Sequence, residues 1–264
     1  MKKIIKYLFL LTGGSFILAS CNDFLDREPL DSVTPDNFFF TENDLAAYAV
    51  KHYNFTTHEG FNAGIWRNDN ATDNQAATDY DKKWIPGQWK VPEAYDNPAS
   101  NDPWYFSAIR EANYFLETVV PRFEKGEIEG SETNIKHYIG EMYFLRAKNY
   151  LSKLETFGDF PIIKNTLPDE SASLIQASKR EPRHKVARFI LEDLDLAIGL
   201  LTNTISGGKN RITQNAALLL KSRAALYEAS WLTYHKGTAL VPGGPGWPGK
   251  AEDIADFNID TEIA

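Results

Sequence analysis

Apolar residues recur at every third or fourth position over several long stretches of the chain, and this spacing constrains the fold more than any other feature. It is the spacing of residues on one face of an α-helix. It predicts helices over residues 41–53, 104–120, 132–157, 183–201 and 213–232. Alternation of apolar and polar residues, which would indicate strands, hardly occurs. The sequence therefore predicts an all-α fold.

The helix ends have recognisable signals. Thr41 and Asp44 have the spacing of a capping box. Pro121 is expected to end the second helix and Gly158 the third. Small residues in 140–147 and 216–224 would let neighbouring helices approach closely. The match to a 34-residue repeat consensus is weak. We therefore expect tetratricopeptide-like helix pairs, an α-α superhelix with long irregular ligand-binding loops, rather than a regular solenoid.

The first twenty residues have the pattern of a secretory signal peptide. A cationic start precedes an apolar stretch at 7–19, which is too short to span about 30 Å of hydrocarbon. Leu18, Ala19 and Ser20 then precede Cys21, and this tetrapeptide resembles the bacterial lipobox. The alternative is a buried cysteine that follows an ordinary signal peptide.

These patterns predict three parts of the chain: a lipoprotein signal peptide at 1–20, a lipidated tether at 21–40 and a helical domain at 41–264. Cys21 is the single cysteine, so an intrachain disulfide is impossible. Acylated with chains such as palmitate, Cys21 would anchor the protein in a membrane, because two or three acyl chains hold stably where one does not.

The stretch at 56–103 has neither helical nor strand periodicity and is crowded with Asn, Asp, Gly, Pro and Trp. An irregular stretch of this length is often a functional loop. Because a pyranose ring combines an apolar face with a rim of hydroxyl groups, a carbohydrate site needs flat aromatic rings beside polar side chains. The candidate ligand-binding residues are Trp66, Arg67, Asp73, Asn74, Trp84 and Trp89. Alternatively, the tryptophans fill the core beneath the loop, and Trp104 in particular is expected to pack.

Other kinds of chemistry have weaker support. The carboxylates of Asp69, Asp73, Asp79 and Asp81 could serve glycoside hydrolysis or could simply close turns. The histidines lack metal-ligand spacing, no phosphate-binding loop is present, and no cofactor is expected. A net charge of −8 argues against a nucleic-acid partner.

Taken in order, segments 18–29, 104–116, 140–163 and 211–227 resemble the amino-terminal half of the SusD/RagB family of nutrient-uptake outer-membrane lipoproteins. The chain departs from the family pattern at Lys148, Asn149 and Lys153. The resemblance implies a helical scaffold that packs against a SusC-like TonB-dependent transporter, with irregular loops holding the substrate. Family members are commonly longer, so we expect this chain to lack the carboxy-terminal half.

The resemblance also implies a function. The chain would be a non-enzymatic, lipid-anchored protein on the outer face of the outer membrane. It would capture an oligosaccharide, or a peptide in some cases, and deliver it to the transporter. The alternatives are a surface glycoside hydrolase using Asp69 or Asp73, and a structural adaptor that binds the transporter and has no ligand of its own.

Overall fold

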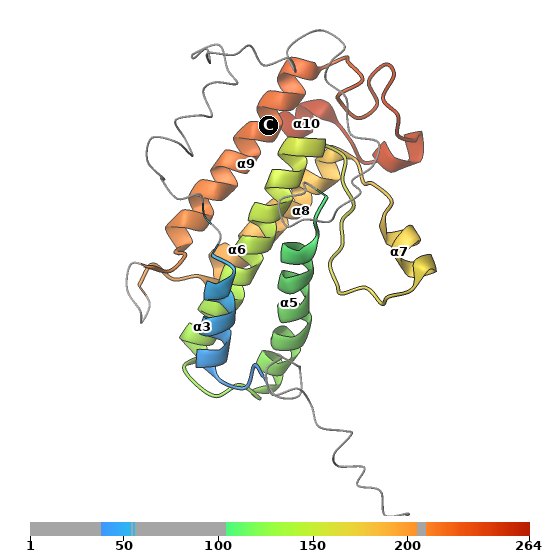
Figure 1. Ribbon diagram of the computed structural model, residues 1–264. Helices are drawn as coiled ribbons and strands as arrows, with labels where there is room; N and C mark the ends of the chain where they lie inside the picture. Colours follow the sequence, from blue (N-terminus) through green and yellow to red (C-terminus); the bar gives the residue numbers. More distant parts are fainter. Residues whose placement is uncertain (1–37, 54, 56–103, 205–209) are drawn as a thin grey trace, which may run out of the picture. The chain divides into compact units, whose positions relative to one another are not determined.

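The computed structural model describes residues 38–53, 55, 104–204 and 210–264 (Figure 1). The chain divides into the units Met1–Phe38 and Phe39–Ala264, and the fold described below is that of the second. Its elements are α3 (Glu42–Lys51), α5 (Ser107–Lys125), α6 (Glu132–Phe157), α7 (Ser171–Ala177), α8 (Arg183–Leu200), α9 (Gln214–His235), η4 (Ala251–Ile254) and α10 (Ile259–Ile263). In the described parts, β-structure is limited to two isolated bridges, Thr41 with Glu129 and Phe160 with Glu181.

Helix α6 lies at the centre of this unit. It packs against α3, α5 and α8, and α8 packs in turn against α9 (Figure 1). Buried side chains lie all around α6, from Ile135 to Leu154, as expected of a helix enclosed by others. Long helices that are successive in the chain thus pack side by side, which confirms the predicted all-α fold of helix pairs.

Several predicted helix ends are confirmed. The hydroxyl of Thr41 accepts a hydrogen bond from the Asp44 amide at 3.3 Å, and the Asp44 carboxylate accepts one from the Thr41 amide at 3.0 Å. This is the predicted capping box. Helix α6 ends at Phe157, and Gly158 follows with a φ of +72°, a value that favours glycine.

The prediction that Pro121 ends the second long helix is wrong, because α5 continues to Lys125. A proline inside a helix removes one backbone hydrogen bond, and tertiary contacts of the following turn can offset that loss. One such contact is the Arg122 guanidinium, which lies 4.3 Å from the centre of the Phe40 ring. The helix ends instead at Gly126, whose left-handed conformation lets its amide bond to the last turn.

Gly140 allows the close helix approach that the sequence predicts. A Cβ atom at this position would lie 3.0 Å from Cγ of Leu201 and 3.2 Å from its backbone nitrogen. Only a residue without a side chain fits this space without displacing backbone, so α6 and the end of α8 can pack tightly.

The carboxy-terminal segment packs over His184 at the start of α8. The His184 side chain is fully buried, and its ring centre lies 4.7 Å from that of Phe257. Among the described residues neither ring nitrogen has a hydrogen-bond partner, and the nearest carboxylate, that of Asp256, is 3.6 Å from Nε2. Burial lowers the pKa of His184, and the positive charge of Arg188 lowers it further.

This burial predicts a loss of stability in mild acid. Below about pH 6.5, His184 is protonated in the unfolded chain but stays neutral in the folded chain, because its pKa there is lower. The free energy of unfolding therefore falls as pH falls. Between pH 7.5 and 5.5 we expect this histidine to contribute to the loss of stability. Urea unfolding at both pH values should show a correspondingly smaller loss for His184→Phe, which keeps a ring against Phe257. An equal pH dependence in the two proteins would contradict this explanation.

Candidate functional site

The residues predicted to bind ligand lie outside the described parts of the chain, as do the acylation site and the carboxylates of the hydrolase alternative. They are Trp66, Arg67, Asp69, Asp73, Asn74, Asp79, Asp81, Trp84 and Trp89, with Cys21 as the acylation site. Trp104 is described and packs as predicted, since its ring centre lies 4.3 Å from that of Phe157 and 5.4 Å from that of Phe160. The guanidinium of Arg180 lies 4.6 Å from the centre of the same ring.

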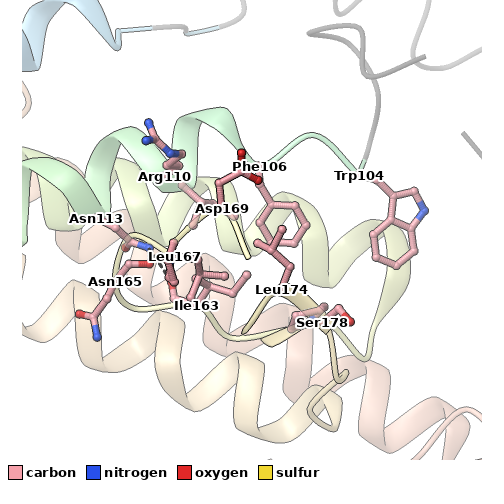
Figure 2. Close-up of a pocket in the computed structure, with 13 residues that line it drawn as sticks. Trp104, Phe106, Arg110, Asn113, Ile163, Asn165, Leu167, Asp169, Leu174 and Ser178 are labelled. Atoms are coloured by element: carbon pink, nitrogen blue, oxygen red, sulfur yellow. Dashed lines mark hydrogen bonds between the residues drawn. The ribbon is translucent and has the colours of Figure 1, made fainter. Parts of the chain in front are cut away.

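A cavity of about 610 Å³ lies between the first turns of α5, the segment 161–169 and α7 (Figure 2). Its size is typical of small-molecule sites. It is lined by Trp104, Phe106, Ile109, Arg110, Asn113, Pro161, Ile163, Asn165, Leu167, Pro168, Asp169, Leu174 and Ser178. Most of these side chains are apolar, and the cavity is the candidate site that the described residues form.

Stacked rings support the part of the wall formed by Trp104 and Phe106. Phe160, fully buried, stacks on Phe106 with ring centres 5.1 Å apart and on Phe157 at 5.6 Å. Phe106 immediately precedes α5, Phe157 ends α6 and Phe160 follows it, so the packing of these rings fixes the start of α5 against the segment after α6.

Asn113 faces the cavity from α5, but its side chain is already occupied. Its amide nitrogen donates to the backbone oxygens of Ile163 at 2.8 Å and Asn165 at 3.3 Å (Figure 2). Its amide oxygen accepts a hydrogen bond from Arg146 at 2.9 Å. Asn113 therefore positions the cavity wall and has little capacity left for a ligand.

Arg146 extends this network into the core. Its Nε and Nη2 atoms donate to the two carboxylate oxygens of Asp193 on α8, at 2.7 and 2.8 Å. Its Nη1 atom also reaches the backbone oxygen of Lys164 at 3.3 Å. Burial raises the pKa of the Asp193 carboxyl group, and the Arg146 guanidinium opposes that rise. The network ties α5, α6 and α8 to the segment that forms the cavity wall.

Tyr150 also holds the segment 161–169 in place. Its hydroxyl group donates to the backbone oxygen of Ile163 at 3.2 Å and accepts from the Ile163 amide at 2.8 Å. Burial raises the pKa of Tyr150 to about 12, so the hydroxyl group stays protonated and available as a donor at neutral pH. Both backbone groups of Ile163 are thereby satisfied.

Two further arginines join helices through buried carboxylates. Arg211, just before α9, donates through Nε to Glu141 of α6 at 2.9 Å, and Glu141 also accepts from the Tyr53 hydroxyl group at 2.7 Å. Arg183 of α8 donates through Nη2 to Glu228 of α9 at 2.7 Å. The sequence interpretation of these motifs as helix packing missed the ion pairs. The available signal was a charged residue, such as Glu141, inside a run of apolar helix positions.

The three positions that depart from the family pattern are half-buried on α6. Lys153 donates to the backbone oxygen of Tyr105 at 3.1 Å, and the Asn149 amide donates at 2.7 Å to a carbonyl one turn earlier. The Lys148 ammonium lies 5.3 Å from the centre of the Phe55 ring, and burial lowers its pKa.

Neither a metal centre nor a membrane span emerges from the described residues. No group of three or more His, Cys, Asp or Glu side chains among them could hold a metal ion. Similarly, none of the helices described is long and apolar enough to cross a membrane.

Paired helices around a buried polar network, with a ligand-sized cavity, define a helical scaffold protein. The family is established by sequence. Residues 23–226 match the SusD-like family model described as "Starch-binding associating with outer membrane". The chain belongs to this family, which confirms the resemblance drawn from its motifs.

Individual relatives agree with this assignment. SusD-like protein P2 of Formosa agariphila is 27% identical over 219 residues, covering 81% of this chain and 40% of the relative. SusD-like protein P25 of the same organism is 23% identical, covering 88% of this chain and 44% of the relative. A crystal structure of a SusD-like protein from Bacteroides fragilis aligns with a TM-score of 0.57 and 25% identity, covering 78% of this chain and 38% of that one. The chain thus spans less than half the length of each.

Proposed function

We propose that this chain captures oligosaccharides at the outer-membrane surface and passes them, uncleaved, to a SusC-like TonB-dependent transporter. The observation that carries the proposal is the family match over residues 23–226, with its description as starch-binding and associated with the outer membrane. The matched range includes the loop at 56–103, whose composition suits sugar recognition.

The proposal includes a lipid anchor at Cys21. Residues 1–20 would be removed as the signal peptide, and 21–40 would tether the helical domain, 41–264, to the membrane surface. Acyl chains on Cys21 would hold the protein at the outer membrane, facing the exterior, where polysaccharide fragments first arrive.

We place the sugar-binding residues in the loop, at Trp66, Arg67, Asp73, Asn74, Trp84 and Trp89. The described residues before and after the segment 56–103 are held firmly. The Tyr53 hydroxyl group is fixed by Glu141 at 2.7 Å and by the Ile212 amide at 2.9 Å. Trp104 is fixed by its ring contacts. Rigid attachment points of this kind are typical of binding loops.

The site is tested by calorimetric titration with maltoheptaose and a panel of other neutral oligosaccharides. We expect saturable binding that is insensitive to salt, since the ligands are uncharged. Trp84→Ala or Trp89→Ala should weaken it at least about tenfold, because each removes a flat apolar surface against a sugar ring. Trp247→Ala is the matched control, since this tryptophan follows α9. Unchanged affinity in both loop variants would contradict the site, and absence of binding across the panel would contradict the function.

A further inference from the structure

We infer that the cavity between α5, the segment 161–169 and α7 binds an apolar organic group, an alkyl chain or aryl ring, attached to a neutral polar head. This inference goes beyond oligosaccharide capture by the loop and does not depend on it. It rests on the lining, the volume and the exposure of α7.

The lining is unsuited to a bare sugar. Aliphatic and aromatic side chains such as Ile109, Ile163 and Leu167 form most of the wall. A sugar ring placed among them would lose hydrogen bonds from its hydroxyl groups to water, and could regain them only from the polar lining residues Arg110, Asn165, Asp169 and Ser178. The buried amide that faces the cavity, that of Asn113, is already bonded to two backbone oxygens and to Arg146. An alkyl or aryl group needs no such partners.

The volume suits a small ligand. At about 610 Å³ the cavity falls within the range of roughly 300–1,000 Å³ that is typical of small-molecule sites. Apolar walls bind water poorly. An apolar group that fills the space removes hydrocarbon surface of the cavity wall and of the ligand from water.

Helix α7 lacks the burial that usually stabilises a short helix. None of its seven residues is buried, although a helix of this length has little stability of its own. Leu174 lines the cavity with 43% of its surface exposed, whereas its neighbour Ile175 is 73% exposed and does not line it. An apolar ligand in the cavity would cover Leu174 and provide part of the missing burial.

The two charged lining residues favour a neutral head group. Arg110 and Asp169 are both exposed lining residues, and Arg110 extends away from the apolar cluster (Figure 2). With one positive and one negative side chain among the lining residues, a strongly charged ligand would be attracted by one and repelled by the other. A hydroxyl group could bond to either.

The test uses N-phenyl-1-naphthylamine, an uncharged fluorescent probe, with the full chain. We expect saturable binding to the unmodified chain. Leu174→Asp should weaken it at least tenfold, because it places a carboxylate in the apolar wall. The matched control Ile175→Asp makes the same change one residue away, outside the lining, and should alter affinity less than twofold. Equal weakening by both variants, or fluorescence that never saturates, would overturn the assignment.

Two additions keep the test decisive. Circular dichroism establishes that each variant is folded, and Leu174→Met, which preserves an apolar wall, should bind the probe as the unmodified chain does. Competition then distinguishes the sources of the apolar group: displacement by octanol supports a free amphiphile, and stronger displacement by octyl-β-glucoside supports a substituted sugar. Displacement by glucose, or by neither octyl compound, overturns the inference. If the unmodified chain binds the probe but no oligosaccharide, the proposed function is contradicted and the inference about the cavity is not.

Discussion

Replacing Arg146 by alanine should lower the free energy of unfolding by about 3–5 kcal/mol, as is typical when one partner of a buried ion pair is removed. Asp193 is 1% exposed, and its two oxygens would lose both charged donors. The Asn113 amide oxygen would lose its donor as well. Since these groups lie between α5, α6 and α8, water cannot readily replace the guanidinium. Urea unfolding at neutral pH, followed by circular dichroism, measures the change.

Two controls separate this effect from a general sensitivity to lost charge. Lys164 forms a surface ion pair with Glu192 at 3.9 Å, and Lys164→Ala should cost less than about 0.5 kcal/mol. The double variant Arg146→Met with Asp193→Leu removes both charges and should recover much of the loss. If Arg146→Ala were no less stable than Lys164→Ala, the network would not have the structural role we assign to it.

Replacing Arg211 by alanine should lower the free energy of unfolding by about 3 kcal/mol, the lower end of the range for a buried pair. Glu141 has no exposed surface, and it would keep hydrogen bonds from Tyr53 and His137 that soften the loss. The change should also loosen α3, because Arg211 donates to the backbone oxygen of Ala46 at 3.2 Å. Urea unfolding measures the first effect and amide hydrogen exchange across α3 the second.

Arg223→Ala is the control for this second change. Arg223 lies exposed on α9, and its side chain makes no ion pair or hydrogen bond with the described residues. Its replacement should change stability by less than about 0.5 kcal/mol. Faster amide exchange throughout the unit, rather than first in α3, would argue against a local connection between Arg211 and α3.

The long helices could be predicted from sequence because their apolar spacing persists over many turns. The predicted bounds of 132–157 are those of α6, where Gly158 provides the end signal. Local sequence signals gave wrong or missing helix bounds where tertiary contacts determine the structure. Pro121 lies inside α5, where the next residue, Arg122, packs on Phe40. Helix α7 escaped prediction because its seven residues are too few for apolar spacing to recur.

The cavity could not be predicted because its walls come from segments far apart in the chain. Trp104 and Asn113 belong to one stretch, while Ile163 and Leu174 belong to others. Only packing brings them together. A buried ion pair could have been predicted from the sequence at Glu141, because this charged residue lies among apolar positions of α6. The sugar-binding residues of the loop stay predictions, because they lie outside the described parts.

The ion pairs also give a physical meaning to the motifs that identified the family. Arg146, Glu141 and Arg211 each join two elements that are distant in sequence. Such pairs require both geometry and complete hydrogen bonding to be stable. We infer that these motifs maintain the scaffold.

The most direct test of oligosaccharide capture without cleavage is a titration of the purified chain with neutral oligosaccharides, followed by recovery and size analysis of the bound ligand. The account predicts saturable binding and recovery of the ligand at its original length, without new reducing ends. Failure to bind any of them, or steady release of shorter fragments, would contradict it.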